Sequence, residues 1–297
     1  MHAKGEHMVY QALSCHKDLF ELLQQNSFEG AVHSVFHRVL NVHIPSGDFL
    51  FTIASNTLDN APFTIRVRLD GSSDFRTLIK TGIRVTAGKE GVYLGESLFV
   101  ALKHPTLWQP KLLAFPPDRR LADHNLQVLR ERLRTLPGGG CGMAGLFSYG
   151  NAGGIFERTL SERTNKLLEA LAGKDISSIR QAILGLIGLG PGLTPSGDDF
   201  LLGMICCGHV PGAPFAAYSD IFSSAVLQNR LRTNDISYAA LLHGTKGQMR
   251  EYIAACINAL MYEDNTAALH TAIDRVLQIG STSGCDICTG IYFGLCL

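Results

Sequence analysis

Two short segments of this chain carry residues that could do chemistry, and both have the same form. The first is Ser196-Gly197-Asp198-Asp199 followed by Gly203, and the second is Ser283-Gly284-Cys285-Asp286 followed by Gly290. In each segment a serine stands three residues before an aspartate, which is the spacing of a capping box, and apolar residues follow. The sequence therefore predicts that each segment opens a helix, over residues 196–208 and 284–296.

A helix N-terminus suits small anions, because its first N–H groups lack partners within the helix and the helix dipole is positive there. Glycine-rich sequence precedes the first segment, and glycine lets a ligand approach the bare N–H groups closely. The alternative is that both segments are ordinary caps whose downstream glycines let two helices pack closely. The candidate anion-binding residues are Gly190, Gly192, Thr194, Ser196, Gly197, Ser283 and Gly284.

Charged side chains near these segments are the candidates for catalysis. Helix N-termini stabilise the ionised forms of Asp198, Asp199 and Asp286. Asp199 and Asp286 stand at the capping-box position, where a purely structural role is open, whereas Asp198 has no counterpart in the second segment and is freer to hold Mg²⁺ or a substrate N–H. Arg232 precedes another helix start, with Thr233 and Ser237 as further binding candidates, and suits carboxylate or phosphate; a solvated basic turn is the alternative.

Three other motifs receive weaker functional interpretations. The glycine-rich run 138–145 lacks the P-loop lysine, so a flexible loop or lid is favoured over a nucleotide site, and Cys141 within it is read as an incidental thiol. His33, His37 and His43 fall on one face of a predicted strand, too far apart for one metal ion. The Cys285–Cys288 spacing fits zinc or redox chemistry, but core packing is favoured because no second pair accompanies it.

Composition indicates a globular protein acting on a small molecule or a protein partner. Of the 297 residues 46% are apolar, and 26 basic residues balance 26 acidic ones, which argues against nucleic-acid or membrane-surface binding. The eight cysteines show no regular disulfide spacing, which favours reduced thiols in the cytoplasm. We see no signal peptide or membrane-spanning run, and we expect a soluble cytoplasmic protein.

The hydrophobic periodicity changes along the chain. It predicts a lead-in segment over 1–29 with a helix over 9–25, and a β-rich domain over 30–117 whose first strand includes residues 32–44. A helical domain is predicted over 118–297. Strands followed by helices without alternation indicate the α+β class, with a small antiparallel β barrel or sandwich before an all-helical domain.

The motifs together resemble the AllH family, formerly called YlbF. The resemblance rests on 190–203, on Thr233-x-x-Ile236-Ser237 and on 280–290, and with the strands near residue 32 it covers about residues 30–297. It implies a subunit of oxamate carbamoyltransferase, assembled with two other subunits in allantoin degradation, a branch of purine catabolism. The implied reaction is phosphorolysis of oxalurate to oxamate and carbamoyl phosphate, for which the site must hold phosphate against the ureido carbonyl and stabilise the oxyanion.

Two other functions stay open at this point. The chain could be a noncatalytic anion-binding or scaffolding subunit, because no His, Cys or Lys motif demands chemistry, or an independent enzyme acting on another small carboxylate or phosphate. No cofactor is implied with certainty, and Mg²⁺ at Asp198 is the one candidate. The convergence of both Ser-Gly-x-Asp turns on one small anion, such as oxalurate, phosphate or carbamoyl phosphate, is the expectation that the structure can test.

Overall fold

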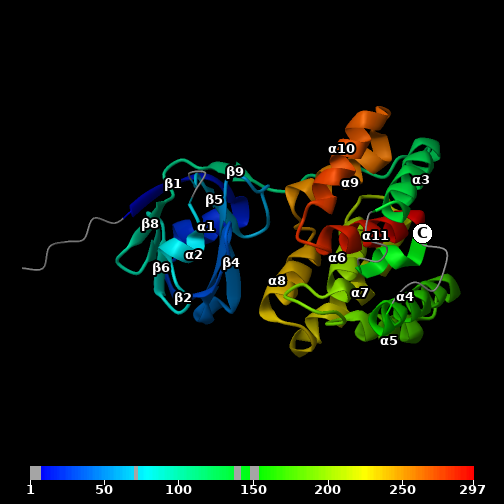
Figure 1. The fold of residues 1–297 in the computed structure, drawn as a ribbon, viewed down its shortest axis with the longest axis horizontal. Helices are drawn as coiled ribbons and strands as arrows, with labels where there is room; N and C mark the ends of the chain where they lie inside the picture. Colours follow the sequence, from blue (N-terminus) through cyan, green and yellow to red (C-terminus); the bar gives the residue numbers. More distant parts are fainter. Residues whose placement is uncertain (1–7, 70–72, 137–141, 148–153) are drawn as a thin grey trace, which may run out of the picture. The chain divides into compact units, whose positions relative to one another are not determined.

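The protein consists of two compact units. The computed structural model describes residues 8–69, 73–136, 142–147 and 154–297, which divide into Met1–Gln109 and Pro110–Leu297 (Figure 1). The first unit is built from strands and the second from helices, so the predicted α+β class is confirmed.

The first unit is a closed β barrel. Its strands follow the order β5-β4-β3-β2-β6-β7-β8-β1, and the barrel closes where β1 pairs with β5, while β9 pairs along the second half of β1. The predicted barrel is therefore present, although it is not purely antiparallel, because β1–β8, β1–β9 and β4–β5 are parallel pairs. The strands are β1 (Met8–His16), β2 (Phe28–Val35), β3 (Val39–Ile44), β4 (Phe49–Ser55), β5 (Thr64–Val67), β6 (Arg84–Gly88), β7 (Gly91–Leu94), β8 (Leu98–Ala101) and β9 (Thr106–Trp108).

The lead-in helix predicted over 9–25 is half wrong. Only α1 (Lys17–Gln25) is helical, with Leu19 and Leu23 buried one turn apart, and the preceding residues form β1. β1 pairs with β5, β8 and β9, so backbone hydrogen bonds to three strands override the local helical pattern. The short helix α2 (Phe75–Leu78) completes the helices described in this unit.

The stretch 32–44 forms a hairpin, where the sequence predicted one strand. β2 and β3 pair antiparallel, with Val32 opposite Val42, and the turn between them contains no glycine or proline to signal it. His33 therefore lies on β2, His37 in the turn and His43 on β3, so the predicted single histidine face does not form. The 3₁₀ turn Pro45–Gly47 then leads into β4.

Apolar side chains such as Phe51 and Ile65 fill the barrel core. One buried histidine beside them has no hydrogen-bond partner for its ring. His16 ends β1, is 2% exposed, and has its ring 5.8 Å from that of Phe63 and 6.0 Å from that of Trp108. Neither ring nitrogen has a hydrogen-bond partner. Burial lowers the pKa of His16 below its ordinary value of 6.5, because desolvation penalises the charged ring; the charge of Asp18 acts in the opposite direction.

The second unit begins at Pro110, earlier than the helical domain predicted from residue 118. The segment after Pro110 is tied to helices of its own unit, because Leu113 N–H donates to Asn258 Oδ1 at 2.9 Å and Tyr262 donates to the Ala114 carbonyl at 2.6 Å. The helices are α3 (Arg120–Arg134), α4 (Ile155–Gly173), α5 (Ile176–Leu186), α6 (Ser196–Gly208), α7 (Ser219–Leu227), α8 (Asp235–Gly244), α9 (Glu251–Tyr262), α10 (Thr266–Leu277) and α11 (Ser283–Cys296), with 3₁₀ helices η2 (Gly142–Phe147), η3 (Pro214–Tyr218) and η4 (Arg230–Arg232).

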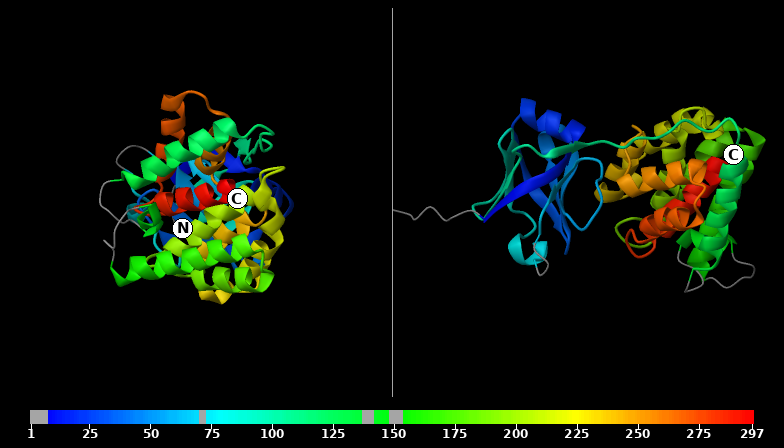
Figure 2. Two further views of the ribbon diagram at one scale, coloured as in Figure 1. Left: turned by 90° about the vertical axis from the view of Figure 1, so that its right-hand side faces the viewer. Right: turned by 90° about the horizontal axis from the view of Figure 1, so that it is seen from above.

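Helices α6 and α11 form the centre of this unit. Figure 2 shows α11 in the middle of the helical unit with other helices around it. Every residue of α6 is buried, as is α11 from Ser283 to Ile291. The two helices cross at Gly203 and Gly290: a Cβ atom at Gly203 would lie 3.0 Å from the Gly290 Cα and 2.2 Å from the Ile287 carbonyl oxygen. Only glycine at both positions permits this approach.

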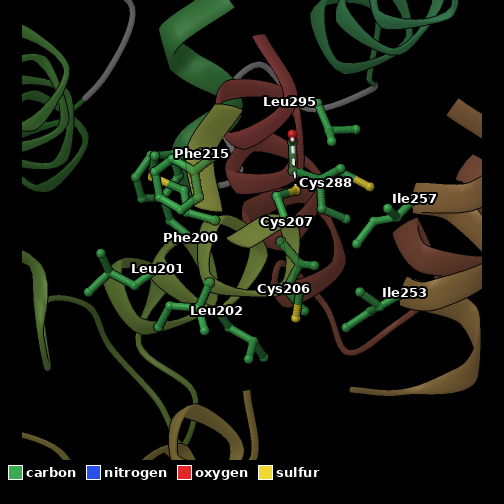
Figure 3. Close-up of a cluster of buried hydrophobic side chains, with 14 of the residues drawn as sticks. Phe200, Leu201, Leu202, Cys206, Cys207, Phe215, Ile253, Ile257, Cys288 and Leu295 are labelled. Atoms are coloured by element: carbon green, nitrogen blue, oxygen red, sulfur yellow. Dashed lines mark hydrogen bonds between the residues drawn. The ribbon is translucent and has the colours of Figure 1, made fainter. Parts of the chain in front are cut away.

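Apolar side chains from both central helices complete the core. Phe200, Leu201 and Cys206 extend from α6, and Ile253 and Ile257 approach from α9 (Figure 3). Both cysteines of the Cys285–Cys288 pair lie in the same core, 5% and 0% exposed. Among the described helices, none is long and apolar enough to cross a membrane.

Candidate functional site

The two Ser-Gly-x-Asp turns lie side by side. The Thr194 hydroxyl oxygen, just before α6, is 2.8 Å from the Ser283 hydroxyl oxygen at the start of α11. The contacts are reciprocal between the helices: Ser283 hydrogen-bonds Asp199, and Ser196 hydrogen-bonds Asp286. The sequence alone could not show that these turns, 89 positions apart at the Thr194–Ser283 contact, share one place.

The turns are not capping boxes, so that prediction is wrong. Pro195 is the N-cap of α6 and Thr282 the N-cap of α11, and neither helix has a side-chain cap hydrogen bond. Each serine is instead the first helical residue. Its hydroxyl faces the aspartate of the other helix, because the glycine crossing brings the two helix starts together.

The predicted bare amides at Gly197 and Gly284 are also wrong. Gly197 N–H donates to the Leu189 carbonyl at 2.8 Å, and Gly284 N–H donates to the Ile279 carbonyl at 2.9 Å. A Cβ at Gly197 would lie 2.1 Å from the Leu186 carbonyl oxygen, and one at Gly284 would lie 2.0 Å from that of Val276. Both glycines therefore let a helix start pack against the end of the preceding helix, and their amides are not available to a ligand.

Asp199 and Asp286 form a buried acidic pair at this junction. They are 5% and 0% exposed, and Oδ2 of each is buried without a hydrogen-bond partner. Burial raises the pKa of Asp199 to about 7; hydrogen bonds from Ser283 and Thr194 lower it, and the charge of Asp286 raises it. Burial likewise raises the pKa of Asp286 to about 7, against hydrogen bonds from Met143 N–H and Ser196. Carboxyl groups with such pKa values either exchange protons near neutral pH or need a positive partner.

Asp198 does not have the free oxygen atoms that the sequence suggested. Its Oδ1 accepts a 2.8 Å hydrogen bond from Gly188 N–H, and its Oδ2 accepts from the hydroxyls of Ser237, at 2.7 Å, and Thr233. Asp198 therefore fixes the turn before α6 to the start of α8. Both carboxylate oxygens are engaged, so this side chain has no open position for Mg²⁺ or a substrate N–H.

The remaining predicted residues surround the exposed part of the first turn. Gly190 and Gly192 have φ values of 143° and 90°, and Gly192 is exposed with no atom within 4 Å of a Cβ position. Arg232 is exposed at the end of η4, and its carbonyl lies against Gly188, where a Cβ would meet it at 1.9 Å. Among the described residues, the exposed Arg232 guanidinium takes part in no ion pair.

One residue of this site lies in the glycine-rich run. Met143 N–H donates to Asp286 Oδ1 at 2.5 Å, and a Cβ at Gly142 would lie 2.0 Å from the same oxygen, so η2 covers Asp286. The sequence signal for this close approach was the glycine at position 142, which has a φ of 52° in the structure. Cys141 and most of the predicted lid lie outside the described residues. A separate cavity of about 560 Å³, lined by residues of α4 and α5, contains none of the predicted site residues.

Two models of known protein families match the chain. Residues 186–295, which contain both Ser-Gly-x-Asp turns, match the family model described as oxamate carbamoyltransferase subunit AllH, and residues 11–107 match the AllH family N-terminal domain. The chain belongs to the AllH family. As an AllH-family chain it is a carbamoyltransferase subunit, and its barrel corresponds to the family's N-terminal domain. No solved structure matches the chain.

Proposed function

We propose that this AllH-family chain is the subunit of a cytoplasmic three-chain carbamoyltransferase that phosphorolyses oxalurate to oxamate and carbamoyl phosphate. The observation that supports the proposal is the convergence of the two Ser-Gly-x-Asp turns, with the Thr194 and Ser283 hydroxyls 2.8 Å apart, within the segment that matches the AllH model. Two companion subunits complete the enzyme in this proposal.

The junction and the turns beside it supply the groups that an anionic substrate needs. In this proposal the hydroxyl groups of Thr194, Ser196 and Ser283 turn from the carboxylates of Asp199 and Asp286 and donate to a carbonyl or phosphate oxygen of the substrate. The Arg232 guanidinium suits a carboxylate or phosphate. Phosphate attacks the ureido carbonyl carbon, the bond from that carbon to the nitrogen of the oxamate group breaks, and the phosphate proton passes to that nitrogen. Donors aimed at the carbonyl oxygen stabilise the charge that develops during the attack.

Asp198 has a positioning role in this proposal, because it holds Gly188, Thr233 and Ser237 around the turn. Asp199 and Asp286 lie beneath the hydroxyl groups and are the proposed catalytic carboxylates. Two ionised carboxylates repel an anion, so their charge must be balanced before phosphate or oxalurate binds close to them.

The experiment is reconstitution with the two companion subunits, followed by assay of carbamoyl phosphate from oxalurate and phosphate, and of the reverse reaction with oxamate. We expect Thr194→Val to lower kcat/KM about 100-fold, the order of effect for one lost oxyanion donor. Thr271→Val is the matched control, because Thr271 is exposed on α10 and bonds only its own helix carbonyl at Ala267.

Two results would contradict the proposal. A reconstituted complex that makes no carbamoyl phosphate in either direction rules out the reaction. If Thr194→Val weakens assembly with the partners but leaves the turnover of the assembled complex unchanged, the chain is a scaffolding subunit rather than a part of the active site.

A further inference from the structure

The acidic pair of Asp199 and Asp286 has two oxygen atoms that the protein does not satisfy. Both Oδ2 atoms are buried and lack hydrogen-bond partners, in side chains that are 5% and 0% exposed. A buried carboxylate without a partner is costly, and nearly all buried polar atoms in proteins are paired. The unpaired oxygens therefore indicate a ligand that the chain itself does not provide.

The surroundings show what kind of ligand fits. Among the described residues, no lysine, arginine or histidine forms an ion pair with Asp199 or Asp286, and none is among the groups that lower their pKa values. The two helix starts contribute only about half a positive charge each. The amides of the second to fourth residues of both helices already donate to backbone carbonyls, as Gly197 and Gly284 do. Positive charge is what the junction lacks.

The size of the ligand is limited by the cover over the pair. Gly142 lies against both carboxylate oxygens of Asp286, and Met143 N–H bonds one of them, so a large ligand is excluded from this side. Hydroxyl oxygens of Thr194, Ser196 and Ser283 surround the pair. Carboxylate and hydroxyl oxygens are ligands that hard divalent cations prefer.

We propose that Asp199 and Asp286 bind one hard divalent cation, of the Mg²⁺ class, through their unpaired Oδ2 atoms. The hydroxyls of Thr194 and Ser283, which lie beside the pair, are the additional oxygen ligands in this proposal, and water completes the coordination. Two carboxylates balance the charge of a divalent cation. This position differs from the Mg²⁺ site that the sequence suggested at Asp198, whose oxygens are engaged by Gly188, Thr233 and Ser237.

The cation would also make the junction compatible with an anionic substrate. With the charge of the acidic pair neutralised, phosphate could approach the hydroxyl groups without meeting a net negative site. This consequence rests on the proposed function, whereas the cation site itself does not.

The test is a Mn²⁺ titration of the metal-free full-length chain at about pH 8, where both carboxyls are ionised. Electron paramagnetic resonance measures the free Mn²⁺ at each point of the titration. We expect one Mn²⁺ bound per chain and displaced by Mg²⁺. Asp199→Asn and Asp286→Asn should each weaken binding by about ten-fold or more, because each removes one of two anionic ligands. Asp220→Asn is the matched control, since Asp220 occupies the first turn of α7 but is exposed.

Far-ultraviolet circular dichroism is the check that each variant is folded. The isosteric Asn at position 286 preserves the acceptor for Met143 N–H. The proposal is overturned if the wild-type chain leaves Mn²⁺ free at about 1 mM, a concentration that saturates all but the weakest sites of this class. That result means that a proton or water satisfies the pair. Equal binding by wild type and both Asn variants also overturns it. Mn²⁺ bound at these residues in a complex that makes no carbamoyl phosphate refutes the reaction and leaves the cation site intact.

Discussion

Substituting Gly203 by alanine tests whether the glycine crossing sets the distance between α6 and α11. The added Cβ would lie 2.2 Å from the Ile287 carbonyl oxygen and 3.0 Å from the Gly290 Cα, whereas ordinary contact begins at 3.4 Å. Both obstacles are main-chain atoms, and α6 is buried along its whole length. Because no side chain can rotate away, the two helices must separate by about 1 Å to bring the Cβ–oxygen distance of 2.2 Å to ordinary contact.

The expected cost follows from the packing. Overfilling a tight core costs about 1–3 kcal/mol, and a backbone obstacle places Gly203→Ala at the upper end. Alanine offsets about 1 kcal/mol of this cost, because its helix propensity is higher than that of glycine. We therefore expect Gly203→Ala to lower the free energy of unfolding by ~2 kcal/mol or more. Separation of the helices also moves Ser283 away from Asp199, so Mn²⁺ affinity should fall together with stability.

The assay is urea unfolding followed by far-ultraviolet circular dichroism, with Gly173→Ala as the control. Gly173 ends α4, and a Cβ there meets no atom within 4 Å, so its alanine variant should be neutral or up to about 1 kcal/mol more stable. Gly290→Ala meets the Phe200 carbonyl at 2.1 Å and should resemble Gly203→Ala. The double variant should cost less than the sum, because the first methyl already separates the helices. Equal stability of Gly203→Ala and Gly173→Ala would refute the reasoning.

Two further predictions concern the barrel and the turn. Burial lowers the pKa of His16, so the unfolded chain takes up a proton at higher pH than the folded one. The free energy of unfolding of the barrel is therefore full above pH 6.5 and falls as the pH drops below that value. Trp108 fluorescence in urea at several pH values measures this, and His16→Phe should flatten the pH dependence, whereas an unchanged slope would assign it to other groups. Asp198→Asn should cost about 1–3 kcal/mol, because one amide oxygen cannot replace two acceptor oxygens for Gly188 and the hydroxyls. An Asp198→Asn variant as stable as Asp220→Asn would show that these hydrogen bonds contribute little.

Much of the fold could be predicted from local pattern. Helix α6 was predicted with its exact bounds and α11 within one residue, since apolar helical periodicity and small polar residues mark both starts. The errors fell where a change of structure carries no turn residue, as between β1 and α1 or between β2 and β3, and where pairing with distant strands decides the conformation.

The sequence located the two turns but not the hydrogen bonds between them. The sequence by itself determined two matching turns, with hydroxyl and carboxyl groups at the starts of two apolar helices. Local rules assign each serine to its own helix as a cap, because they consider only neighbours three residues apart. The tertiary structure assigned each hydroxyl to the opposite helix, since Gly203 and Gly290 let the two backbones approach within contact distance. That approach also buries Asp199 and Asp286 together, and their raised pKa values and unpaired oxygens exist only because the helices meet.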